Sequence, residues 1–207
     1  MRRGDAPASI ALYERSIAMA RAVPALDPDD LGQSLGNLAI ALVSAGRIDD
    51  ALARAIESRD AFAAVRGADD PRMVQPQQIV GTLQRYAGRP EEALRTLRAT
   101  AALAARVLPA EAEARVNTEV ELALTLLELR HAAEAVPLLR GAVPILERGA
   151  RAGNLAEARF ALARAMIESG DDRARARSLA RAAIAEWSRL GADAPRAEAE
   201  AWLAAHP

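Results

Sequence analysis

The 207-residue sequence contains no cysteine and no lysine, and aromatic residues make up only 3% of it. Without cysteine, the chain can form neither a disulfide framework nor a thiolate metal site. The scarcity of aromatic residues leaves Ala, Leu, Val and Ile to build the core, and small, helix-favouring side chains of this kind suit close packing of helices. The lack of cysteine also fits a cytoplasmic protein, which is the location that we predict.

Histidine is almost absent as well. The only two histidines, His131 and His206, lie far apart in the sequence, one in a predicted turn and one at the C-terminal end. Carboxylate pairs such as Asp49-Asp50 follow the predicted turns, where acidic residues oppose the positive end of a helix dipole. No Gly-rich phosphate loop is present. We therefore predict no enzymatic activity, no bound metal and no cofactor.

The charges of the chain are balanced, with 27 basic and 28 acidic residues and a formal net charge of −1 at pH 7. This balance argues against a nucleic-acid surface and against a charged membrane surface. The longest uncharged stretch, residues 31–46, is too short to span a bilayer. Asp5 and Glu14 interrupt any apolar signal segment after Arg2 and Arg3. We expect neither a nucleic-acid nor a membrane partner.

One pattern recurs along the chain at intervals of 42, 42 and 40 residues. It centres on a tight turn, at Gly46 in SAGRIDDAL and then at Gly88, Arg130 and Gly170. A large apolar residue followed by a small one precedes each turn, and an alanine follows it. The four pairs before the turns are Leu38-Ala39, Val80-Gly81, Leu122-Ala123 and Leu162-Ala163. Small residues let two antiparallel helices approach closely, so the pattern predicts repeated helical hairpins that must stack to bury their apolar faces.

The predicted organisation is a single all-α array over residues 1–207. A helix at 5–23 falls in register with the second helix of a unit, so that its own first helix is missing and one face is open to a partner. Full helical hairpins are expected at 30–65, 71–108, 110–148 and 154–190. A final helix at 195–205 is expected to cap the last hairpin with Trp202 and Leu203.

The residues around the turns resemble the tetratricopeptide repeat. Its usual period is 34 residues, and the longer period here is similar to the long-helix variety, of about 42 residues, found in kinesin light chains and many bacterial regulators. The resemblance implies a right-handed α-solenoid of stacked helix-turn-helix hairpins. Gln84 stands where an aromatic residue is usual, and Arg130 stands in place of a turn glycine.

The segment 158–207 resembles the C-terminal end of repeat arrays attached to bacterial, notably myxobacterial, serine/threonine protein kinases. This resemblance implies a C-terminal regulatory or docking array of a signalling protein. The chain itself has no lysine for the ATP phosphates and neither an HRD nor a DFG motif. A kinase domain would therefore lie upstream of Met1 or in a separate chain, and the sequence leaves this open.

The tetratricopeptide resemblance also implies a concave groove lined by the first helix of each unit. Carried onto this chain, the groove positions include Gln33, Asn37, Gln75, Gln78, Thr82, Arg85, Asn117, Glu121 and Arg164. The same rows hold an apolar strip of Ile40, Val43, Val120, Leu124 and Phe160. Amide side chains beside apolar ones suit an extended peptide or a helix as a ligand.

Two functions follow from this arrangement, and the sequence does not choose between them by itself. The first is a scaffold that binds a peptide or protein segment in the groove. The alternative is a structural module without a peptide ligand, in which polar groove residues only keep the surface hydrated. In that case the array self-associates through the 5–23 helix, with its apolar Ile10, Tyr13 and Ile17. The identity of the partner and the oligomeric state remain open.

Overall fold

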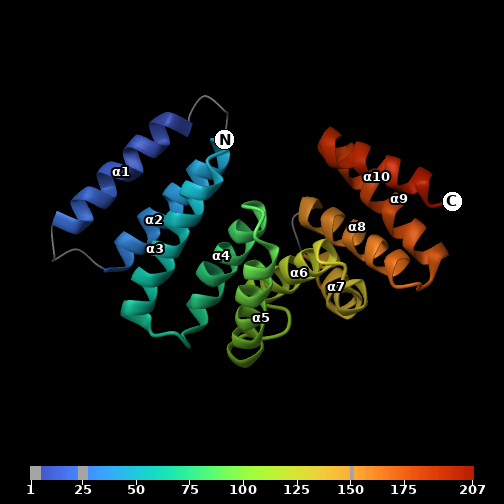
Figure 1. The fold of residues 1–207 in the computed structure, drawn as a ribbon, viewed down its shortest axis with the longest axis horizontal. Coiled ribbons are helices and arrows are strands. Elements are labelled where there is room, and N and C mark those ends of the chain that lie inside the picture. The colour runs from blue at the N-terminus through green and yellow to red at the C-terminus, as the bar shows by residue number, and fades with distance from the viewer. Residues whose placement is uncertain (1–5, 23–27, 150–151) are drawn as a thin grey trace. The chain divides into compact units, whose positions relative to one another are not determined.

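A computed structural model describes residues 6–22, 28–149 and 152–207 (Figure 1). All regular secondary structure in these residues is helical, with ten α-helices and one 3-10 helix. The prediction of an all-α fold made of helical hairpins is confirmed. The chain divides into two compact units, Met1–Pro109 and Ala110–Pro207, which are described one at a time. The single array over residues 1–207 stays a prediction.

The first unit consists of a lone helix followed by two helical hairpins, in which consecutive helices pack against each other. Its elements are α1 (Ala6–Ala22), α2 (Pro28–Ser44), α3 (Ile48–Arg66), η2 (Pro71–Met73), α4 (Val74–Tyr86) and α5 (Pro90–Val107). Asp70 precedes the 3-10 helix, and its carboxylate accepts a hydrogen bond of 2.8 Å from the backbone N–H of Arg72. The predicted first residue, 5, and last residue, 23, of the opening helix lie outside the described residues.

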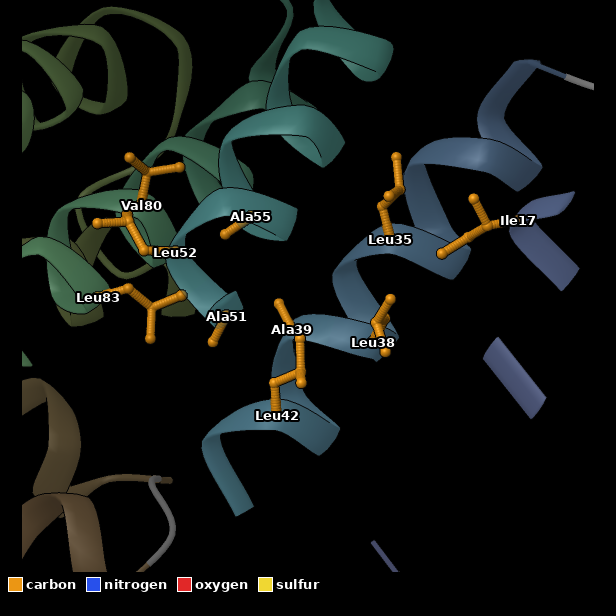
Figure 2. Close-up of a cluster of buried hydrophobic side chains, with 10 residues drawn as sticks. All are labelled: Ile17, Leu35, Leu38, Ala39, Leu42, Ala51, Leu52, Ala55, Val80 and Leu83. Atoms are coloured by element: carbon orange, nitrogen blue, oxygen red, sulfur yellow. The ribbon is translucent and has the colours of Figure 1, made fainter. Parts of the chain in front are cut away.

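The core of the first unit is aliphatic and is centred on α2 and α3 (Figure 2). Side chains from α1 to α4 meet there, and the α2 and α3 residues include Leu38-Ala39 before the turn and Ala51 after it. The cluster comprises Ile17, Leu35, Leu38, Ala39, Leu42, Ala51, Leu52, Ala55, Val80 and Leu83. The alternation of large and small residues in the sequence therefore marks the contact face of the hairpins, as expected for interdigitating helices.

The four hairpin turns share one geometry. Gly46, Gly88, Arg130 and Gly170 all have a left-handed backbone, with φ of 75°, 72°, 64° and 75°. After each of them, the next N–H donates to the carbonyl five residues earlier, over 2.8 to 2.9 Å, as in a Schellman motif. Arg130 is the only non-glycine residue with positive φ in the described part of the chain. The alignment of the turns is thus correct, and Arg130 changes the residue without changing the geometry.

The second unit contains two hairpins and a terminal helix. Its elements are α6 (Glu113–Glu128), α7 (Ala132–Glu147), α8 (Ala152–Glu168), α9 (Arg173–Leu190) and α10 (Asp193–Ala205). The ring of Phe160 on α8 lies edge-on to Trp187 on α9 and to Trp202 on α10, with ring centroids 5.8 and 5.6 Å apart. Trp202 therefore packs against the preceding hairpin, which is the place predicted for the final helix.

The observed helix ends lie close to the predicted ones. The hairpins predicted at 30–65, 71–108, 110–148 and 154–190 correspond to α2–α3, η2–α5, α6–α7 and α8–α9, with ends that differ by a few residues. The final helix begins at Asp193 rather than at residue 195. Such shifts are ordinary at helix ends, where the last turn frays and capping residues are only half helical.

Candidate functional site

Glycines on α2 bring this helix close to α3. A Cβ atom on Gly32 would lie 2.7 Å from the ring of Phe62, and one on Gly36 would lie 3.3 Å from the Oγ of Ser58. Ser58 Oγ donates a buried hydrogen bond of 2.7 Å to the carbonyl of Gly32. Helix α2 is therefore fixed against α3, and the residues on its next face are held in place.

A hollow of about 110 Å³ lies beside this contact, between α2, α3 and α4. Three of the nine predicted groove residues, Gln33, Asn37 and Gln75, line it with their amide side chains. Gln33 Nε2 donates to Asn37 Oδ1 over 3.3 Å. The apolar part of the lining includes Phe62, Ile79 and Ile40, and Ile40 is 55% exposed. The hollow thus combines amide donors and acceptors with apolar surface.

The other predicted residues of the first unit, Gln78, Thr82 and Arg85, occupy a neighbouring row of α4. Gln78 Nε2 donates to Thr82 Oγ1 over 3.3 Å, and the Arg85 guanidinium lies 4.8 Å from the centroid of the Tyr86 ring. All three are half-buried. They do not line the hollow, because Gln75 and Ile79 are the α4 side chains directed to it together with Pro76.

The three predicted residues of the second unit are also separated. Asn117 lines a hollow of about 450 Å³ at the start of α6. Glu121 and Arg164 are half-buried, and the Arg164 guanidinium lies 6.0 Å from the centroid of the Phe160 ring. In the predicted apolar strip, Ile40 is exposed, but Val120 and Phe160 are only 8% and 7% exposed. These two side chains belong to the interior and not to an open surface.

The structure adds residues that the sequence did not mark as part of a site. Phe62 and Ser58 on α3, Gly32 and Gly36 on α2 and Ile79 on α4 all line the hollow. The spacing of Gly32 and Gly36, with amides at the following positions, was the available signal. No such signal marks Phe62 and Ser58. The resemblance implies a groove lined by the first helix of each unit, and these two residues lie on the second helix α3.

The electrostatics of the described residues are mild. The Arg72 side chain and backbone N–H hold the pKa of Asp70 down at about 2. No group of three or more His, Cys, Asp or Glu side chains that could hold a metal ion occurs in the described ranges. None of the described helices is long and apolar enough to cross a membrane.

Comparison with known proteins identifies the repeat class. Residues 30–106 match the tetratricopeptide repeat family. A comparison with curated protein sequences gives no match. The tetratricopeptide resemblance is therefore confirmed for the segment that holds the turns at Gly46 and Gly88.

Solved structures share the fold at low sequence identity. BtubC from P. vanneervenii is 15% identical with a TM-score of 0.76, covering 91% of this chain and 75% of its own. A kinesin light chain-like protein of Podosopora anserina with TPR-like repeats is 22% identical with a TM-score of 0.69, covering 92% and 90%. The Rap conjugation gene regulator of the plasmid pLS20 is 14% identical with a TM-score of 0.73, covering 95% of this chain and 53% of its own. The chain thus has the fold of these repeat proteins.

Proposed function

We propose that the protein is an interaction scaffold that binds a peptide or protein segment at the hollow between α2, α3 and α4. The observation that carries the proposal is the grouping of Gln33, Asn37 and Gln75 around the apolar Ile40 and Ile79. A primary amide both donates and accepts hydrogen bonds, so it can pair with the N–H and C=O groups of an extended main chain. The isoleucines offer an apolar surface for a side chain of the same segment.

The similar structures support this class of function. The Rap regulator was solved in complex with the Phr* peptide. A first helix that carries amides on an exposed face, held against its partner by Gly32 and Gly36, can serve the same purpose in this chain. The remaining groove positions, namely Gln78, Thr82, Arg85, Asn117, Glu121 and Arg164, stay predictions for contacts with a longer ligand.

The test begins with peptides selected from a displayed random library on the purified protein. Asn37→Ala with Gln75→Ala should weaken the selected peptides by roughly tenfold, because two hydrogen-bonding groups are removed from the hollow. Gln77→Ala is the control, since this amide on the same helix α4 neither lines the hollow nor belongs to the predicted groove positions, and it should change affinity by less than roughly twofold. Equal affinity in a folded Asn37/Gln75 variant would contradict the proposed site.

A second candidate function, self-association through α1, rests on a different observation. Leu12 and Met19 are 63% and 64% exposed, and they line a hollow of about 390 Å³ beside α2. The register-equivalent second helix α3 is covered by α2, which buries Ala55 and Ser58 to 3% and 4% exposure. The apolar residues predicted to be open on α1 instead face α2, because Ile17 belongs to the core and Ile10 and Tyr13 pack against it. Ser16 Oγ on the same face shares a hydrogen bond of 2.9 Å with Ser34 Oγ. The open face of α1 is the one that carries Leu12 and Met19. A second copy of the chain could cover this face.

Light scattering after size exclusion tests self-association. A mass that rises with concentration, and that falls to the monomer in Leu12→Ser with Met19→Ser, is expected. Strictly monomeric behaviour at high concentration would count against this candidate.

We also propose, from the resemblance of residues 158–207, a role as a docking or regulatory array of a bacterial serine/threonine kinase. A kinase reading frame in the DNA upstream of Met1 would support that role, and the cytoplasmic location stays a prediction with it.

A further inference from the structure

The floor of the hollow between α2, α3 and α4 belongs to the interior of the first unit. Ala55 on α3, which is 3% exposed, is part of the aliphatic core (Figure 2), and Ile79 on α4 packs against that core. Phe62 on α3 also lines the hollow and is only 7% exposed. A ligand side chain that enters here therefore contacts buried carbon atoms and not a polar surface.

Among the described residues, the lining of this hollow carries no formal charge. Ser58, which supplies a hydroxyl group to the lining, already donates to the carbonyl of Gly32 over 2.7 Å. The Arg66 guanidinium lies 4.1 Å from the centroid of the Phe62 ring, but it is paired with Asp29 over 2.6 Å and does not line the hollow. A charged side chain would be buried here without a counter-charge, which is costly, so the complementary side chain is a neutral one.

The size of the hollow, about 110 Å³, distinguishes between classes of neutral ligand. Sites for cofactors and other drug-sized molecules have volumes of roughly 300 to 1,000 Å³, so this one is too small for them. Benzene binds in an engineered apolar cavity of about 150 Å³ in another protein, so a whole aromatic ring also exceeds the space. The branched aliphatic side chain of leucine, which has fewer carbon atoms than that of phenylalanine, suits this volume.

The amide side chains place the main chain of such a ligand at the rim of the hollow. Gln33 and Asn37 on α2 and Gln75 on α4 supply these amides. The side chains of an extended segment point alternately to its two sides. When the N–H and C=O groups of the segment pair with the amides, one of its side chains is therefore directed to the floor.

We propose that this hollow is an anchor pocket for one leucine side chain of the bound peptide, and that Ile40 and Ile79 are the residues that select it. The inference rests on the proposed function and adds the class of side chain that the ligand carries at this site. Charged side chains are rejected because they find no partner, and aromatic side chains because they find too little room.

The experiment is a titration of the 15N-labelled protein, followed by NMR, with the Nα-acetyl methylamides of leucine, alanine, phenylalanine and lysine. These probes share one main chain and differ only in the side chain. The leucine probe should give saturable shifts in the amide signals of residues 32–40, 55–62 and 75–79. The alanine probe should bind more weakly by roughly tenfold, because it buries less apolar surface. The phenylalanine probe should bind more weakly by roughly threefold, and the lysine probe should give no saturable shift.

Two variants test the assigned residues. Ile79→Ala enlarges the hollow and should reverse the order, so that the phenylalanine probe binds more tightly than the leucine probe. Ile40→Ala changes a side chain that is 55% exposed, which preserves the fold, and it should weaken the leucine probe by roughly threefold. Val65→Ala on α3 is the matched control, because Val65 is 48% exposed and does not line the hollow, and it should leave the titration unchanged.

A leucine probe that binds no more tightly than the other three probes would overturn the inference, and so would an unchanged leucine affinity in Ile40→Ala. Neither result would contradict the proposed function, because the Asn37/Gln75 variant tests recognition of selected peptides by the amides. If the Asn37/Gln75 variant instead bound the selected peptides with equal affinity, the proposed function would fail, whatever the order of the four probes. The two failures are therefore distinguishable.

Discussion

The hairpins α4–α5 and α6–α7 have the same register and the same turn, yet they differ at three equivalent positions. The start of the first is capped by the Asp70 carboxylate, whereas Ala112 at the start of the second offers no side-chain cap. The first helices carry Gly81 and Ala123, both buried, at the contact with the second helix. The turns contain Gly88 and Arg130, with φ of 72° and 64°.

The comparison separates two uses of glycine in one repeat. At the turn, glycine and arginine adopt the same backbone, so the hydrogen bonds and the helix packing determine the geometry there. At the helix contact, a Cβ atom on Gly81 would lie 2.6 Å from Cγ of the buried Leu97. The equivalent Ala123 has its Cβ atom and is still fully buried. The hairpin α4–α5 therefore depends on glycine at the contact, whereas α6–α7 depends on packing that accommodates a methyl group.

The largest effect is expected from adding a methyl group at the tight contact. Gly81→Ala should lower the free energy of unfolding by about 2 kcal/mol, because overpacking against Leu97 outweighs the better helix propensity of alanine. The matched control is Gly141→Ala on α7, where a Cβ atom would meet nothing within 4 Å. That change should raise stability by about 0.5 kcal/mol. Urea unfolding measures both, and a stabilising Gly81→Ala would contradict the assigned role of the contact.

A smaller effect is expected from exchanging the turn residues. Arg130→Gly should raise the free energy of unfolding by about 0.5 kcal/mol, because relief of the left-handed strain exceeds the added entropy of the unfolded chain. Gly88→Arg should lower it by about 1 kcal/mol for the converse reason. The ion pair of Arg130 with Glu168 spans 3.9 Å and is exposed on the arginine side, so its loss matters little. Thermal unfolding of the two variants measures both effects. If Arg130→Gly and Gly88→Arg changed the stability in the same direction, the two turns would not be equivalent.

The hairpins could be predicted from the sequence because their contact faces repeat. Ala39, Gly81, Ala123 and Ala163, all placed at the helix contact by the spacing alone, are buried. Periodicity shows which face of a helix is buried, but it does not show which exposed row borders an opening. The row of Gln78 and Thr82 is thus adjacent to the hollow that Gln75 and Ile79 line. The opening depends on Phe62 from another helix, which no local pattern reveals.

The same limit explains the burial of Phe160, which was expected on the groove surface. Phe160 is covered because Trp187 and Trp202, from two other helices, pack edge-on against its ring. The repeat pattern within one helix contains no information about large side chains that other helices place against it.

The smallest effect concerns the cap at the start of the two hairpins. The pKa of Asp70 is lowered to about 2 by hydrogen bonds from the side chain and backbone N–H of Arg72, so the folded state favours the ionised carboxylate. Its contribution to stability is present above the ordinary pKa of 3.8 and is lost as the pH falls toward about 2. Asp70→Asn keeps an acceptor for the cap but has no charge. The stability difference between the two proteins should therefore persist from neutral pH to about pH 4 and shrink below it. A pH-independent stability difference between Asp70→Asn and the unmodified protein would show that the charge does not stabilise the cap. Ala112→Asp introduces a cap at the other hairpin and should produce a second pH dependence of the same kind.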